Sequence, residues 1–355
     1  MAISISGTLS KAWLAEALGV KFDHDYYFDP NKRYAIDCKC NEYAAEHFPG
    51  IRIFYSESNL GQIDYWDKGQ IQIGGIQPNM ILGMLLDAEF VPRDSSDADI
   101  TLACLAGKSL VDLPFPESLL EHPLIVLLDE QIQQAQENTQ SQLRPIPPFF
   151  WDISGRAVIH GALTTAQKLF GEAFFMDMMT ESKQCMEIMQ WIGDSYIALC
   201  RHFSQIAHLP ITEVHVGECS SCMVSPDLIE RFVVPVTSKI SDELGPIRLH
   251  SCGSSTSYLD SFSKITNLHS LDLGGETSIR RVRQVFGKKL PISIAPLPKD
   301  MSAESTDAIL NRAKQIFEEN DGGNLQYLYH LEPGYNIDTI YALTDFVKSL
   351  PDFLH

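Results

Sequence analysis

The chain has 355 residues, of which 45% are hydrophobic and 21% charged, as in a globular protein with a full hydrophobic core. Its formal net charge of −19 disfavours proteins that bind nucleic-acid phosphates and proteins that adsorb to anionic membranes. Neither a signal peptide nor a transmembrane segment is indicated, so we expect a cytoplasmic protein in which the eight cysteines are reduced.

The first 150 residues give weak structural signals. We expect a helix at 8–18, a helix near 40–47 and short strands near 69–75 and 99–104. Residues 131–150 have the composition of a polar helix end followed by a proline-rich connection. That connection fits a domain boundary or a long loop within one domain.

From residue 156 onward, short apolar strands alternate with amphipathic helices. An apolar stretch from residue 157 leads to a long helix at 180–206 and then to the strand 211–217. Further strands are predicted at 246–250, 268–274, 290–296 and 325–330, with helices at 256–265, 276–286, 302–319 and 336–349. This pattern predicts an α/β protein with the fold of a (β/α)8 TIM barrel. No Gly-x-Gly-x-x-Gly motif follows any of these strands, which disfavours a dinucleotide-binding sheet. We expect a single domain over 1–355, with 1–70 as an N-terminal extension that packs on the barrel.

Polar and sulfur-containing residues follow several of these strands. Cys219 and Cys222 form a Cys-x-x-Cys pair, which suits a redox dithiol, half of a metal site or two small apolar residues. His250 and Cys252 form a His-x-Cys pair after the next strand. Because active sites of barrels lie at the carboxyl ends of the strands, we expect the two pairs to meet. Imidazole and thiolate ligands of this kind predict a zinc site.

Other residues at the strand ends are candidates for different roles. Glu218 is expected to be an exchangeable oxygen ligand, a base or a helix cap, and Asp272, with Gly274 and Gly275, to contact substrate or cap the next helix. His160 and His215 lie within strands, so we expect both to be hydrogen-bonded core residues.

The segments "MVSPDLIERFVVPVTSKI", "LHSCGSSTSYLDSF", "LDLGGE" and "LEPGYNIDTIYALTDFV" resemble the uroporphyrinogen decarboxylase superfamily over about 155–350. The resemblance implies one barrel with a deep pocket at its carboxyl face. Decarboxylases of this superfamily use an arginine-rich N-terminal motif, whereas residues 1–60 hold only Arg33 and Arg52. The methylcobalamin:coenzyme M methyltransferase branch binds zinc through His-x-Cys, matched by His250 and Cys252, and through a distant cysteine.

No cysteine follows Cys252, and the segment near the Pro-Gly turn reads "LYHLEPG". Cys219, Cys222 or His330 is therefore expected to replace the third ligand, with His330 also a catalytic candidate and Tyr329 a substrate contact. We predict a zinc-dependent methyltransferase acting between a methyl-corrinoid protein and a thiol or similar small-molecule acceptor. The alternatives are a tetrapyrrole decarboxylase and a corrinoid- or metal-binding protein without catalysis.

Overall fold

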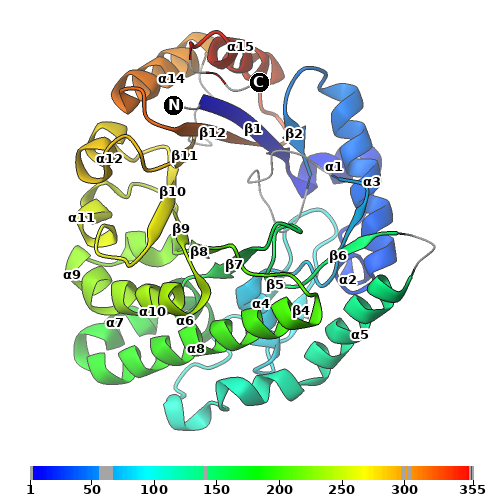
Figure 1. The fold of residues 1–355 in the computed structure, drawn as a ribbon, viewed down its shortest axis with the longest axis vertical. Coiled ribbons are helices and arrows are strands. Elements are labelled where there is room, and N and C mark those ends of the chain that lie inside the picture. Colours follow the sequence, from blue (N-terminus) through cyan, green and yellow to red (C-terminus); the bar gives the residue numbers. More distant parts are fainter. Residues whose placement is uncertain are drawn as a thin grey trace.

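The computed structural model describes residues 3–55, 67–138, 142–296, 301, 305–351 and 353. Eight parallel strands form a curled sheet with helices around its outside (Figure 1). Across the sheet, the order is β2 (Ile53–Phe54), β1 (Ile3–Leu9), β12 (Leu325–Leu331), β11 (Ile292–Ala295), β10 (Leu268–Gly274), β9 (Ile247–Ser251), β8 (Glu213–Gly217) and β7 (Arg156–His160). This arrangement is the (β/α)8 barrel that the sequence predicts.

Helices connect the strands and cover the outside of the sheet (Figure 1). Several begin at side-chain caps: the hydroxyl of Ser305 accepts from the N–H of Ala308, and that of Ser278 from the N–H of Arg281. The helices of the repeating part are α6 (Ala162–Phe170), α7 (Ala173–Thr180), α8 (Ser182–Ile206), α9 (Pro226–Leu228), α10 (Val234–Leu244), α11 (Leu259–Phe262), α12 (Ile279–Phe286), α14 (Thr306–Asn320) and α15 (Ile337–Lys348).

The first half of the chain adds smaller elements around the barrel. Its helices are α1 (Lys11–Leu18), α2 (His24–Phe28), α3 (Pro30–His47), α4 (Pro78–Met84) and α5 (Pro123–Glu137). Two short strand pairs accompany them, β3 (Gln70–Gln72) with β6 (Arg144–Ile146), and β4 (Phe90–Val91) with β5 (Asp99–Ile100).

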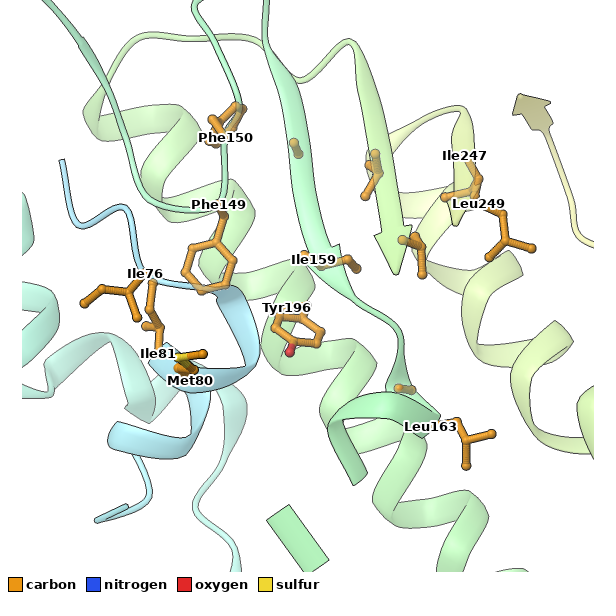
Figure 2. Packing of buried hydrophobic residues seen from close by; sticks show 14 of the residues in the cluster. Ile76, Met80, Ile81, Phe149, Phe150, Ile159, Leu163, Tyr196, Ile247 and Leu249 are labelled. Carbon is orange, nitrogen blue, oxygen red and sulfur yellow. The ribbon is translucent and has the colours of Figure 1, made fainter. Parts of the chain in front are cut away.

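The segment from Phe149 to Trp151 extends the sheet beyond β7. The N–H of Val158 donates to the carbonyl of Phe149, and the N–H of Trp151 donates to the carbonyl of Arg156. Figure 2 shows Phe149 beside Ile159 of β7, with Ile76 and α4 on its other side. This segment brings the Trp151 ring beside His215 of β8, while the Phe149 ring packs on Phe203 of α8.

The N-terminal segment differs from the prediction. The expected helix at 8–18 begins only at Lys11, because Ile3–Leu9 form β1, which pairs along its whole length with β12. Segment 1–70, expected to pack on the barrel as an extension, contributes β1 and β2 to the sheet itself. The sequence "ISISGTL" alternates apolar and small polar residues, and its polar members Ser6 and Thr8 are buried.

The helix expected near 40–47 begins at Pro30, and the strand expected at 99–104 covers only Asp99–Ile100. The helix expected at 256–265 is a 3-10 turn followed by Leu259–Phe262. The strands predicted from residue 211 onward are found with small shifts at their ends.

Among the described residues, no helix is both long enough and apolar enough to cross a membrane.

Candidate metal centre

Three side chains at the carboxyl ends of β8 and β9 bring metal-binding atoms together. The Sγ atom of Cys252 lies 3.1 Å from Nε2 of His250 and 3.1 Å from Sγ of Cys219. All three donor atoms lie within 4.8 Å of one another. The Cys-x-x-Cys and His-x-Cys segments therefore meet, and Cys252 lies in contact with both Cys219 and His250.

The backbone register explains this meeting. Gly217, the last residue of β8, is aligned with His250 of β9, and the N–H of Glu218 donates to the His250 carbonyl at 2.8 Å. The chain then leaves β8 in a 3-10 turn over Cys219–Met223 that carries Cys219 toward β9. Two neighbouring strands therefore fix the donor atoms, which is the usual origin of a rigid site in a barrel.

A carboxylate on the next strand orients the imidazole. Nδ1 of His250 lies 3.0 Å from Oδ2 of Asp272, and the two residues are aligned between β9 and β10. Although burial opposes its charged form, Asp272 raises the pKa of His250 well above the ordinary value. Burial likewise opposes ionisation of Asp272, but His250 and Arg248 hold the pKa of its carboxyl well below the ordinary value. Nδ1–H thus donates to Asp272, which leaves Nε2 facing the two sulfur atoms.

Cys219 and Cys252 change each other's pKa because their thiols are in contact. The hydrogen bond with Cys219 lowers the pKa of Cys252 to about 4, with His250 acting in the same direction. The same contact, together with burial, raises the pKa of Cys219. One thiolate is therefore stabilised beside a protonated imidazole before any further ligand is present.

The donor set fits zinc in the three-ligand form. Two thiolates and one imidazole are the ligands that this ion prefers, and the Asp272–His250 hydrogen bond is the usual outer contact of a zinc-bound histidine. Three protein ligands leave a fourth position for a water or a substrate, as in catalytic zinc sites. Cys252 is exposed, so this position is accessible from the mouth of the barrel.

Cys222 lies outside this group of donor atoms. Its thiol is exposed and donates to the carbonyl of Cys219 at 3.2 Å. In the structure Cys219 contacts Cys252 rather than Cys222, so the close pair of sulfur atoms joins two strands instead of the Cys-x-x-Cys segment.

Glu218 points away from the metal-binding atoms, to the start of α6. Its carboxylate accepts hydrogen bonds from the N–H groups of Leu163 and Thr164, each at 3.2 Å, and from the Thr164 hydroxyl at 3.1 Å. A side chain at Gly161 would overlap this carboxylate. Burial raises the pKa of Glu218 to about 7, although these hydrogen bonds favour its charged form. These contacts give Glu218 the role of a helix cap. The capped helix is α6, which precedes β8 in the chain, and not the helix that follows β8.

The glycines after β10 shape the turn that carries Cys252. A Cβ atom on Gly274 would lie 2.5 Å from the carbonyl oxygen and 2.6 Å from the nitrogen of Gly253. Gly253 itself has a φ of 65°, which favours glycine. Gly275 lies in the turn that follows. Close backbone contact thus accounts for Gly274, while Asp272 acts on His250.

Tyr329 and His330 lie at a separate place, the end of β12. Nδ1 of His330 is 2.6 Å from the Thr8 hydroxyl, and Nε2 is 3.1 Å from Glu332. Tyr329 is buried against Gly7, and its hydroxyl donates to the carbonyl of Arg52 at 3.4 Å. Neither residue belongs to the group of three donor atoms.

A cavity of about 330 Å³ adjoins the three donor residues, which form part of its wall. Two rows of aligned strand residues contribute to it, Val158 and His215 in one, and His160, Gly217, His250 and Asp272 in the other. Phe149 and Trp151 cover the side next to β7. Phe149 has a φ of 65°, a strained conformation of a kind that is often found at functional sites.

The structure corrects the expectation for His160 and His215. They were expected to be hydrogen-bonded core residues, but neither ring makes a hydrogen bond to any described residue, and the Nδ1 atom of each is buried. Both line the cavity instead. Alternation along the strands predicts that both side chains face the cavity. His160 is the last residue of β7, and His215 lies on the same face of β8 as Gly217, the last residue of that strand.

Comparison with known proteins identifies the family. Residues 157–350, more than half of the chain, match the family model of uroporphyrinogen decarboxylase (URO-D). No curated protein sequence matches the chain. Among solved structures, a methyltransferase from Methanosarcina mazei is similar, with a TM-score of 0.65 and 14% identity, over 98% of this chain and 93% of that one. Such a low identity supports the shared barrel fold alone. The family match, together with the strand-end motifs, shows that the chain belongs to the uroporphyrinogen decarboxylase family.

Proposed function

We propose that this protein is a zinc-dependent methyltransferase that moves a methyl group from a corrinoid to a thiol acceptor. The observation that carries the proposal is the meeting of the donor atoms of Cys219, His250 and Cys252 within 4.8 Å. Three such ligands would leave the fourth position of a bound zinc to the substrate. Cys219 takes the place of the distant cysteine that this chain lacks.

Zinc bound by these residues would lower the pKa of an added thiol, so that the thiol is an anionic nucleophile at neutral pH. The protein's own residues hold and orient the donor atoms. Asp272 keeps the proton of His250 on Nδ1, and the β8–β9 register fixes the spacing between Cys219 and Cys252. In the transfer, an S–C bond forms while the Co–C bond of the corrinoid substrate breaks, and its electron pair stays on cobalt.

A methyltransferase from Methanosarcina mazei has the same barrel fold, so methyl transfer is an activity that this fold can support. A tetrapyrrole decarboxylase has to bind several carboxylates. No lysine or arginine is among the described residues that line the cavity. The open fourth position also favours catalysis over a closed, purely structural metal site.

The first experiment measures zinc content and methyl transfer from methylcobalamin to a thiol in the purified protein. We expect about one zinc per chain, and loss of both zinc and transfer in Cys219→Ser, His250→Ala and Cys252→Ser. Cys222→Ser is the matched control, because its thiol makes only a hydrogen bond to the Cys219 carbonyl.

Three results would contradict the proposal: no bound zinc, full activity without zinc, or equal loss of zinc in Cys219→Ser and Cys222→Ser. The last would show that the Cys-x-x-Cys segment acts as a unit. Uroporphyrinogen turnover by the same preparation would instead favour the decarboxylase.

A further inference from the structure

The cavity beside the three donor residues has an unusual chemical character for a site next to a metal. Half of the side chains that line it are apolar or aromatic, among them Pro148, Trp151 and Val158. A substrate whose sulfur reaches the donor atoms would therefore place the rest of its body against rings and aliphatic groups.

One strand position beside the cavity has no side chain. Gly217 is aligned between His160 on β7 and His250 on β9. A Cβ atom there would lie 3.7 Å from the Ile159 carbonyl and 3.9 Å from the His160 ring, both ordinary contacts. Packing at the Cβ position therefore does not demand a glycine, and a larger side chain would extend into the cavity.

Two of the polar groups that line the cavity without a described partner are imidazoles. His160 and His215 make no hydrogen bond to the described residues. The His215 ring lies 4.3 Å from the Trp151 ring and 5.8 Å from the His250 ring, measured between centroids. Burial, with Lys168 and His250, lowers the pKa of His160 to about 3, so this imidazole is neutral at physiological pH. A neutral imidazole donates one hydrogen bond and accepts another, as an alcohol or amide requires.

The charges around the cavity disfavour an anion. Asp272 contributes a carboxylate, and Arg248, which pairs with it at 3.5 Å, is not among the lining residues. Two thiolates balance the charge of Zn²⁺, so a bound substrate thiolate already adds a negative charge. A carboxylate or sulfonate on the same molecule would lose its hydration shell without gaining a cationic partner among the described lining residues.

Resting on the proposed function, we infer that the methyl acceptor is an uncharged thiol with an apolar or aromatic body and at most a hydroxyl or amide group. The sulfur lies at the metal-binding atoms, the body between Trp151 and the face of β7, and the neutral polar group within reach of His160 or His215.

The experiment compares thiols of closely similar size, one neutral and one anionic in each pair: 3-mercaptopropan-1-ol with 3-mercaptopropanoate, and 4-(mercaptomethyl)benzamide with 4-(mercaptomethyl)benzoate. Binding is measured in the cobalt-substituted protein by its visible absorption, which changes when a thiolate binds the cobalt ion. We expect each neutral member to bind at least tenfold more tightly than its anionic partner. Equal or tighter binding of the anions overturns the inference.

A second measurement needs neither metal nor thiol. Quenching of Trp151 fluorescence in the metal-free protein is titrated with benzyl alcohol and benzoate, with Trp151→Phe as the control for signal from other tryptophans. Benzyl alcohol should bind at least tenfold more tightly. If neither compound binds, or benzoate binds as well, the inference fails. A cobalt spectrum that thiols leave unchanged, in a protein that still prefers benzyl alcohol to benzoate, would contradict the proposed methyl transfer. That result would still support a cavity that prefers uncharged ligands.

Two variants test the location. Gly217→Val should weaken benzyl mercaptan binding at least tenfold while zinc is retained, since it fills the space between His160 and His250. His160→Lys should reverse the preference in favour of the anions. If either variant does not fold, the other decides; unchanged binding in both would place the acceptor elsewhere.

Discussion

Two places on the barrel carry residue types suited to a metal or catalytic site: the ends of β8 and β9, and the end of β12. At the first, the donor atoms of Cys219, His250 and Cys252 face one another. At the second, both ring nitrogens of His330 already contact Thr8 and Glu332. The difference indicates that a polar residue at a strand end is suited to bind a metal only when its donor atom is not already engaged by neighbouring side chains.

The strongest test of this comparison removes one histidine at each place. His250→Ala should weaken zinc binding by a hundredfold or more, since one of three ligands is lost from a site worth about 10–16 kcal/mol when complete. His330→Ala should leave it unchanged. Competition against a chelator measures both affinities. An equal loss in the two variants would mean that the end of β12 takes part in the metal site.

Two glycines offer a second test, based on packing. Gly274→Ala would press a Cβ atom against the Gly253 backbone next to Cys252, whereas Gly7→Ala would overlap the Tyr329 ring. Each should lower the free energy of unfolding by roughly 1–3 kcal/mol, as overpacking does. Only Gly274→Ala should also weaken zinc binding, because the Cys252 turn has to move. Denaturant unfolding and zinc titration separate the effects; weaker zinc binding in Gly7→Ala would count against independent sites.

The carboxylates that contact the two histidines sharpen the comparison further. Asp272→Asn should weaken zinc binding ten- to a hundredfold, because the neutral amide holds the His250 imidazole less firmly. Glu332→Gln, the matched change beside His330, should have no effect on zinc. Isothermal titration at fixed pH measures both. Unchanged affinity in Asp272→Asn would show that the β8–β9 backbone alone positions the ligands.

Most of the fold was predictable because the second half of the chain repeats strands and helices with clear periodicity. The first strand was not, since Ser6 and Thr8 make "ISISGTL" look polar although the neighbouring strands bury it. Of the site, the pairing of His250 with Cys252 and the role of strand ends followed from the sequence. Which cysteine of the Cys-x-x-Cys pair turns inward did not, because the 3-10 turn after Gly217 decides it.

The cavity was harder to predict than the metal-binding residues. It depends on an absent side chain at Gly217 and on Phe149 and Trp151, which come from a segment that the sequence indicates only as a connection. His160 and His215 resembled core residues because they lie in apolar strands. Their orientation depends on the register of four strands, and no local pattern contains that register.

The smallest expected effect concerns the pH dependence of stability. Burial lowers the pKa of His160 to about 3, whereas an unfolded histidine has a pKa near 6.5. Between these values the unfolded chain binds a proton that the folded chain excludes, so the stability is present above pH 6.5 and is lost as the pH falls toward 3. Between pH 7.5 and pH 5.5 this loss amounts to about 1 kcal/mol.

His160→Gln and His160→Phe both remove the titrating group, one keeping a polar side chain and the other a ring. In zinc-free protein, the free energy of unfolding of either variant should fall by about 1 kcal/mol less over this pH interval than that of the unchanged chain. Urea unfolding at the two pH values measures the difference. If both variants keep the full pH dependence, His160 is protonated in the folded protein, and the cavity then presents a cation that would favour an anionic acceptor.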